Sequence, residues 1–514
     1  MEYYKNYKTP IKKLCESFLK SRDEWKNKCL KSKKIIKRLK NQNQYSQKRI
    51  SELKQTIKAL KTDLALEKAK LQNIKYEKKE DELPEAFNEA PSRHTYSIGH
   101  IMMFISLVLY SGISMRGAAN AIEIFILQFQ VNLLIPSWYA GRLWLLRLGL
   151  YKLMSPKKIA KDWIWIVDHT NQIGSEKCLL ILGVRQSSLG SNFCLKHEDV
   201  EPISLIPVNS SNGQIVWGQL EDSVKRTGVP RAIVGDHGSD IKSGIEKFCK
   251  KHKKTSYIYD VKHKTASVLK QELKGDEDWE KFCKYANQKR NEIQQTKLAP
   301  AMPPNQKSKA RYMNIGRLIS WGKKLLSFFK RPKKEGKIEI DHEDLQNKFE
   351  DLKEYEPKID EWDELYKITQ TTESLIRQEG IYQGCSLKLE TELKAQVKTE
   401  RGQRIANKLI RYAEQESLKV RGNEKLLGSS EIIESVFGKL KRIEGDQDKS
   451  GFTGNVLCVC AMVSKTTSET IKKAMESIPT SELQKWCKEN LGDSIQCQRN
   501  KILKGCVDEA IAKS

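Results

Sequence analysis

Residues 162–168 read Asp-Trp-Ile-Trp-Ile-Val-Asp, and residues 177–184 read Lys-Cys-Leu-Leu-Ile-Leu-Gly-Val. Both runs are short, apolar and bounded by turn-forming residues, which predicts two adjacent β-strands. The first run is apolar almost throughout, as is typical of a strand buried on both faces of a central sheet. Its last residue, Asp168, is costly at the end of a buried strand unless a positive charge compensates it. Asp168 is therefore either a structural cap of the following turn or a metal ligand.

The segment around this stretch, residues 158–274, alternates strand and helix patterns in a definite order. Strands are expected near 163–168, 178–184, 201–207, 232–234 and 256–261, and helices near 212–226, 239–251 and 264–273. Three strands followed by alternating helices and strands predict a mixed α/β layer. A second acid, Asp236, comes just after the fourth strand. Asp240 competes with it, and Asp236 could also be an ordinary turn residue.

A third acid lies on a helical pattern much later in the chain. Residues 429–441 read Ser-Ser-Glu-Ile-Ile-Glu-Ser-Val-Phe-Gly-Lys-Leu-Lys, with the apolar residues on one helical face. Both Glu431 and Glu434 are candidates for a functional role. Glu434 is preferred, because an acid in the first turn of a helix, such as Glu431, is already favoured by the helix dipole.

This order of elements, with Asp168 ending the first strand, Asp236 after the fourth and Glu434 on a later helix, resembles the ribonuclease H-like core of DDE transposases and retroviral-type integrases. Glu434 followed by Lys441 is similar to the Glu-six-residues-Lys pattern of bacterial insertion-sequence transposases. The Tyr and Arg that precede that Glu in the family are replaced here by Leu427 and Ser430. The resemblance covers roughly 161–274 and 426–445. It implies a mixed five-stranded sheet with helices on both faces.

The resemblance also implies a chemistry, namely metal-dependent cleavage of DNA strands and transfer of the new ends to target DNA. Mg²⁺ ions, with Mn²⁺ as a substitute, would activate the attacking oxygen and stabilise the leaving one. Mg²⁺ prefers hard oxygen ligands, so carboxylates suit it. Asp168 is expected to bridge two ions, while Asp236 and Glu434 bind one each. His237 and Lys441 are expected DNA contacts, although Lys441 could equally be a solvated charge.

The composition agrees with a polyanionic partner. The 514 residues include 92 Lys and Arg against 65 Asp and Glu, a formal charge of +27. Such an excess favours nucleic acid, here double-stranded DNA as transposon ends and target. Cysteines without paired spacing and the lack of a signal-peptide pattern predict a reduced, cytoplasmic setting, and the resemblance implies a nucleoid-associated bacterial protein. The most apolar run, 101–109, is too short to span a membrane.

Residues 1–84 are predicted to form a coiled-coil dimerisation arm. The sequence contains no Gly or Pro between Pro10 and Pro84, and an apolar heptad seam is strongest from Ile50 to Leu64. Asn43 at a core position would fix the register of a two-stranded coil. We therefore expect a homodimer or higher oligomer. The alternative is a long solvated helix, and its basic first half could also lie on DNA.

Residues 92–157 contain three short helical patterns, with Ser114 and Ser137 as N-caps of the second and third. This arrangement resembles a helix-turn-helix DNA-binding domain, whose last helix enters the major groove. Arg142 and Arg147 lie on that helix and are expected to contact DNA. In the alternative, the helices form an apolar core and both arginines only reach out from it.

The rest of the chain is assigned by pattern alone. It divides into a helical insertion domain at 275–425, the core helix with the catalytic Glu at 426–445, and a helical C-terminal region at 446–514. Trp279, Trp321 and Trp362 of the insertion could stack on a DNA base or belong to the core. Two other functions stay open, a catalytically inactive DNA-binding protein on the same scaffold and a ribonuclease H-like nuclease without strand transfer.

Overall fold

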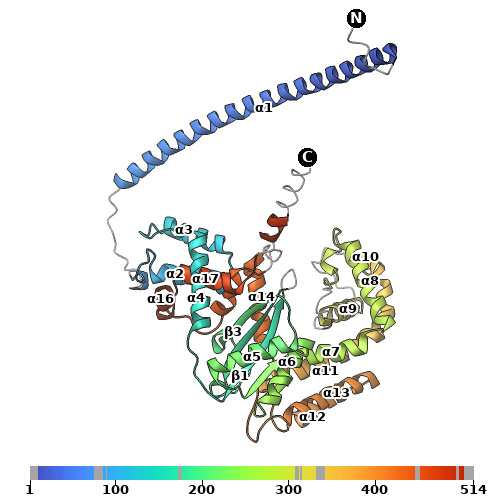
Figure 1. Cartoon of the computed structure of the whole chain (residues 1–514). Helices are drawn as coiled ribbons and strands as arrows, with labels where there is room; N and C mark the ends of the chain where they lie inside the picture. The colour runs from blue at the N-terminus through green and yellow to red at the C-terminus, as the bar shows by residue number, and fades with distance from the viewer. Residues whose placement is uncertain are drawn as a thin grey trace. The chain divides into compact units, whose positions relative to one another are not determined.

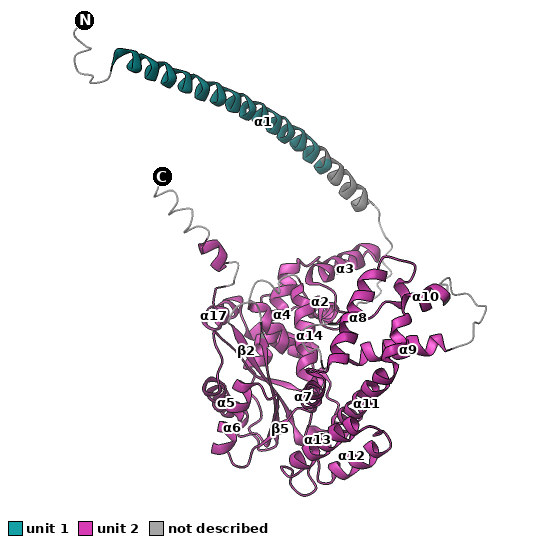
Figure 2. Cartoon of the chain, turned by 90° about the vertical axis from the view of Figure 1, so that its right-hand side faces the viewer, with its two compact units in different colours: residues 1–82 teal, residues 83–514 magenta. Residues whose placement is uncertain are grey.

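The computed structural model describes residues 10–73, 85–87, 89–171, 176–306, 312, 315–330, 342–445, 452–493 and 497–502. The chain divides into two compact units, residues 1–82 and residues 83–514 (Figure 2). Most described residues are helical, and the second unit contains a five-stranded mixed sheet. No described helix combines the length and the apolar character that crossing a membrane requires.

The first unit contains one long helix, α1 (Ile11–Asn73). Its predicted seam is an exposed apolar stripe within this unit, with Ile50, Leu53 and Ile57 each about half accessible at 52%, 47% and 53%. Apolar side chains spaced in heptads on an otherwise charged helix are the pattern of a coiled-coil strand. The seam positions from Leu64 onward lie outside the side chains that the structure describes.

The second unit begins with three capped helices, α2 (Ile98–Leu109), α3 (Met115–Gln128) and α4 (Trp138–Met154). In each case a serine before the first turn accepts a hydrogen bond from the backbone N–H three residues later, which satisfies one of the free donors of the helix end. The predicted caps of α3 and α4, Ser114 and Ser137, are confirmed.

Three C-terminal helices pack against α4. They are α15 (Cys458–Met462), α16 (Ser468–Ser477) and α17 (Thr480–Asn490). Leu145, Leu148 and Leu150 of α4 are consequently buried completely, so the helix is enclosed on several sides. The N-terminal helices and the C-terminal region thus share one core, although the sequence patterns suggested two separate regions.

The sheet lies in the middle of the second unit (Figure 1). Its strand order is β3-β2-β1-β4-β5, with the first three strands antiparallel and the pairs β1–β4 and β4–β5 parallel. The strands are β1 (Trp163–Asn171), β2 (Lys177–Arg185), β3 (Glu201–Val208), β4 (Ala232–Gly235) and β5 (Ser256–Tyr259). All five expected strands are present.

Helices cover both faces of this sheet. Trp163, Trp165 and Val167 of β1 point to one face, where they pack with α5 (Gly213–Thr227) and α6 (Ser239–Lys251). Ile164 and Ile166 point to the other face and belong to the core shared with α7 (Val261–Leu273) and α14 (Glu431–Glu444). This alternation follows from the two-residue period of a strand and explains why β1 is apolar nearly throughout.

The insertion between the two parts of the core is helical, as expected. It consists of α8 (Glu277–Ile293), α9 (Ile315–Phe329), α10 (His342–Lys348), α11 (Glu356–Glu379), α12 (Cys385–Lys394) and α13 (Glu400–Ser417). Trp279 and Trp362 are buried within it and meet edge to face, with ring centroids 4.9 Å apart. Both belong to the insertion core, which favours the packing role over base stacking. The helices α11 and α13 pack on α7 and connect the insertion to the sheet layer.

Candidate functional site

Two of the predicted acids lie side by side where the parallel pairing of β1 and β4 ends. The expectation that Asp168 ends the first strand is wrong, because β1 continues through it to Asn171 in its pairing with β2. Val167 of β1 is paired with Gly235 of β4, and Asp168 and Asp236 are the next residues on each strand path. Since the residues two before each acid, Ile166 and Val234, point to the face of the sheet that α14 covers, the strand period directs both carboxylates to that face as well.

Local hydrogen bonds orient both carboxylates. The Asp168 Oδ1 atom accepts a hydrogen bond of 2.7 Å from the backbone N–H of His169. The Asp236 Oδ1 atom accepts one of 3.0 Å from the backbone N–H of Gly238, in the turn before α6. In each case this local bond limits the directions in which the carboxylate can point.

The charges of the other two predicted acids, Asp236 and Glu434, act on Asp168. Burial, together with the negative charges of Asp236 and Glu434, raises the pKa of Asp168 to about 7. The positive charge of His263 acts in the opposite direction. A buried carboxyl group that faces two other carboxylates is a place where an added cation lowers the free energy.

Glu434 reaches this site from α14. The helix buries Ile433, Val436 and Leu440 against the sheet layer, which leaves Glu434 on the edge of the buried face. Its Oε2 atom accepts a hydrogen bond from the Lys262 Nζ atom of α7, at 2.5 Å. Both side chains are about 30% accessible, so the ion pair is partly shielded from water.

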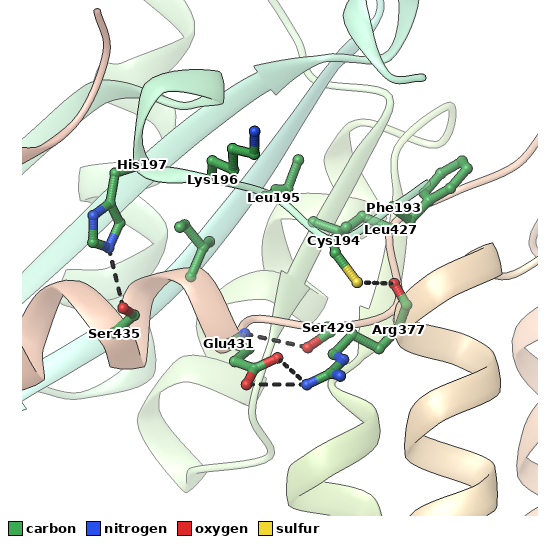
Figure 3. A pocket seen from close by; sticks show the side chains of 11 residues that line it. Phe193, Cys194, Leu195, Lys196, His197, Arg377, Leu427, Ser429, Glu431 and Ser435 are labelled. Carbon is green, nitrogen blue, oxygen red and sulfur yellow. Dashed lines mark hydrogen bonds and ion pairs between the residues drawn. The ribbon is translucent and has the colours of Figure 1, made fainter. Parts of the chain in front are cut away.

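Glu431, the competing acid on the same helix, faces another direction. It forms an ion pair with Arg377 of α11, with 3.0 Å between Nη1 and Oε2 (Figure 3). Glu431 and Arg377 line a cavity of about 510 Å³, together with residues 193–197 and Ser435. The charge of Glu434 raises the pKa of Asp168, whereas the carboxylate of Glu431 is paired with Arg377. This difference favours Glu434 as the third acid of the site.

A fourth acid, which the sequence analysis did not identify, connects the helices beside the site. Asp260 is completely buried between β5 and α7. Its Oδ2 atom accepts hydrogen bonds from the backbone N–H and the Oγ of Ser430, at 2.6 and 2.9 Å. Its Oδ1 atom accepts bonds from the backbone N–H and Nδ1 of His263, at 2.7 and 3.0 Å. An Asp inside the otherwise uncharged pattern of the last expected strand, 256–261, was the available signal.

The cap at Asp260 also explains where α7 begins. The helix begins at Val261, earlier than the expected position near 264, because Asp260 caps it at the end of β5. Its first turn thereby presents His263 to the acids. Burial opposes the charge on His263, but its bond to Asp260 and the charges of Asp236 and Asp168 raise its pKa to about 9. A positively charged imidazole therefore stands beside the carboxylates at neutral pH.

Asp240, the alternative to Asp236, has other partners. Its Oδ2 atom lies 3.0 Å from Lys177 Nζ and 3.6 Å from His169 Nδ1. Asp240 is therefore compensated by the ammonium group of Lys177 on β2. Asp236, by contrast, influences Asp168 directly. Asp236 is the better candidate of the two.

The two predicted DNA contacts near the acids differ in their surroundings. His237 stacks on Tyr259, with ring centroids 3.5 Å apart and planes inclined by 6°. Burial, helped by Lys242, lowers the pKa of His237 to about 4, so the ring is neutral at neutral pH. Lys441 is exposed in the last turn of α14. Of the two, only Lys441 offers a positive charge to a phosphate at neutral pH.

Both predicted arginines of α4 have internal partners. The Arg142 Nε atom donates to the Oδ1 of Asn455 at 2.9 Å. Arg147 is 8% accessible, and its guanidinium group donates to the carbonyl oxygens of Ile478, at 2.5 Å, and Met475. These contacts attach α4 to the C-terminal region and favour the helical-core alternative over a DNA-reading helix.

The donor set of the acid site suits a hard divalent cation. Its candidate ligands are the carboxylates of Asp168, Asp236 and Glu434, which are the oxygen donors that Mg²⁺ and Mn²⁺ accept. Within the part of the chain that the structure describes, no three His, Cys, Asp or Glu side chains are grouped closely enough to hold one metal ion. In this arrangement Glu434 is instead bound to Lys262.

No protein-family model matches the chain, and no curated protein matches it either. Among solved structures, the chain is similar to one described as a Drosophila P element transposase strand transfer complex. The alignment has a TM-score of 0.36 and 12% sequence identity, and it covers 75% of this chain and 93% of the other.

Proposed function

We propose that this chain is a DNA transposase of the DDE class, which binds transposon ends and performs metal-dependent strand cleavage and strand transfer. The observation that supports this most directly is the pairing of Val167 with Gly235, which brings Asp168 beside Asp236 where the parallel pairing of β1 and β4 ends. The effect of the Glu434 charge on Asp168 adds the third acid. The sheet order, with helices on both faces, is the one expected for a ribonuclease H-like core.

In this proposal Asp168, Asp236 and Glu434 hold Mg²⁺, or Mn²⁺ in its place. When bound, the metal supplies activation of the attacking oxygen and stabilisation of the leaving oxygen. The protein's own part is to orient the carboxylates. Asp168 is held by the N–H of His169, and Asp236 by that of Gly238. Burial of the Asp168 carboxylate strengthens its attraction to a bound cation, because little water screens the two charges.

The charge of the chain supports DNA as its substrate. A formal charge of +27 favours association with a polyanion through the release of counterions, independently of sequence. Lys441 lies on the same helix as Glu434, so a phosphate near the acids could contact it. We assign Lys441 as a backbone contact, which positions the DNA without reading its bases.

The exposed seam of α1 supports a homodimer. Ile50, Leu53 and Ile57 would be buried if two copies of α1 formed a coiled coil. Apolar side chains of this size are each worth about 1.5–3 kcal/mol when they are buried fully. Joining two transposon ends requires two active sites in one assembly, and a dimer arm would provide them.

A second candidate function is DNA binding without catalysis on the same scaffold. The ion pair between Lys262 and Glu434 favours it, because that pair neutralises one of the three acids without a metal. In this case the chain would bind DNA but leave the strands intact. A nuclease without strand transfer differs from the transposase only in its products, which are cleaved strands without joined DNA.

The test uses the full chain, MgCl₂, labelled duplexes from the DNA that flanks its own gene, and a supercoiled plasmid as target. We expect strand cleavage and joined DNA products. Asp168→Asn and Asp236→Asn should abolish both, while DNA binding persists. Asp240→Asn is the matched control, since Asp240 is paired with Lys177, and it should retain cleavage. Cleavage without joined products supports the nuclease, and binding without cleavage overturns the enzyme assignment.

A further inference from the structure

Lys262 lies in the first turn of α7, and its side chain points to α14, the helix that carries Glu434. Its ammonium group is 2.5 Å from Oε2 of Glu434. The carboxylates of Glu431 and Glu373 also stabilise its positive charge, so acids from both α14 and α11 surround it. Lys262 is therefore the cation nearest to the proposed catalytic Glu434 among the contacts that the described residues make.

The position of Lys262 is set by backbone bonds. The backbone N–H of Val261 donates to the carbonyl of Gly428 at 3.0 Å, and Asp260 binds the N–H of Ser430 at 2.6 Å. These two bonds join the start of α7 to the start of α14. Because both helix starts are fixed to each other, the lysine at the second position of α7 remains within reach of α14.

The consequence follows from the charge of the site. An ammonium ion at hydrogen-bond distance occupies one acceptor position of a carboxylate, and its positive charge repels a divalent cation at the same group. Binding of a metal at Glu434 must therefore either displace Lys262, which loses the Coulomb energy of the partly shielded pair, or act against the repulsion between the two cations. The affinity of the acid site for metal is reduced in either case.

We infer that Lys262 is a resident cation of the acid site, which competes with the divalent metal for Glu434 and so sets the metal affinity. The inference rests on the proposed function for the assignment of Glu434 as a metal ligand. Lys262 is thus a positioning residue, since it acts on the metal through Glu434. In the absence of metal it keeps the Glu434 carboxylate paired.

The experiment measures Mn²⁺ binding to the DNA-free, full-length protein by the electron paramagnetic resonance signal of free Mn²⁺. We expect Lys262→Met to bind Mn²⁺ about tenfold more tightly than the wild type, as a loss of about 1.4 kcal/mol in competing interaction would give. Lys262→Arg, which keeps the charge, should leave the affinity near the wild-type value. Lys262→Gln serves in place of the methionine variant if that variant does not fold.

Arg377→Met is the matched control. It removes the cation that pairs with Glu431 on the same helix, and it should leave Mn²⁺ affinity unchanged within about threefold, because Glu431 is not one of the assigned ligands. In a Glu434→Gln background, Lys262→Met should no longer tighten Mn²⁺ binding, because the acid for which both cations compete is gone.

Two outcomes separate this inference from the function proposed above. If Glu434→Gln weakens Mn²⁺ binding but Lys262→Met does not tighten it, Lys262 does not compete and only this inference is overturned. If Glu434→Gln leaves Mn²⁺ binding unchanged, Glu434 is not a ligand, and the metal assignment of the transposase proposal is overturned along with the inference.

Discussion

The buried carboxylate of Asp260 accepts a hydrogen bond of 2.6 Å from the backbone N–H of Ser430, which lies 170 residues later in the chain. Ser430 directly precedes α14, so this bond fixes the start of the helix that carries Glu434. The same carboxylate caps α7 through His263. One side chain thus sets the relative position of the last strand and of both helices beside the acid site.

Asp260→Ala is expected to destabilise the protein strongly. The substitution leaves the buried donors of Ser430 and His263 without their acceptor, and an unsatisfied buried group costs about 1–3 kcal/mol, more when it is charged. We predict a loss of about 3 kcal/mol in the free energy of unfolding, measured by urea denaturation. Asp222→Ala is the control, because Asp222 forms only an exposed pair with Lys225. Equal stability of both variants would contradict the structural role of Asp260.

Glu434→Gln and Glu431→Gln should differ in DNA cleavage. Removal of a residue that only hydrogen-bonds to a metal ligand lowers activity by about 10–100-fold. Removal of a ligand itself should lower activity by at least that much. We predict a loss of at least about 100-fold for Glu434→Gln and less than about fivefold for Glu431→Gln, measured as the rate of strand cleavage under saturating Mg²⁺. The reverse order would assign the site to Glu431.

Lys152 should make stability depend on pH. The side chain is 4% accessible, and its Nζ atom donates to the carbonyls of Ala461, Val463 and Ser464 and to Oγ1 of Thr466. Burial lowers its pKa from 10.5 to about 7. Between these values the unfolded chain binds more protons than the folded one, so the free energy of unfolding rises with pH.

The measurement for Lys152 compares urea denaturation of the wild type and Lys152→Met at pH 7 and pH 9. We predict that stability increases more with pH in the wild type, since the variant lacks the group that titrates. Other groups titrate equally in both proteins, so the difference between them isolates Lys152. Equal slopes would show that the four acceptors hold the ammonium in its charged form.

The predicted dimer arm is tested at its seam. Leu53→Asp places a charge at a core position of the proposed coiled coil and should convert a dimer into a monomer, measured by light scattering coupled to gel filtration. Gln55→Asp is the control, because position 55 lies on the opposite side of the helix from Leu53 and Ile57 in the heptad. A dimer that survives Leu53→Asp would place the oligomer interface elsewhere.

The sequence alone determined the features that depend on short-range periodicity. The uninterrupted apolar run of β1 predicts its burial on both faces, and the strand patterns place Asp168 and Asp236 directly after Val167 and Gly235, the last parallel pair of β1 and β4. The serine caps Ser114 and Ser137 follow from a local hydrogen bond between neighbouring residues. Such patterns can be recognised without any knowledge of distant contacts, because the residues involved are only a few positions apart.

Only the tertiary structure decided which polar side chains meet. Glu431 and Glu434 are one turn apart on one face, so periodicity could not separate them, whereas their partners Arg377 and Lys262 come from different helices. Arg147 resembled a DNA contact until residues more than 300 positions later supplied carbonyl acceptors for it. A buried charge is stable only where the whole fold brings compensating groups to it, and that condition is invisible in a local pattern.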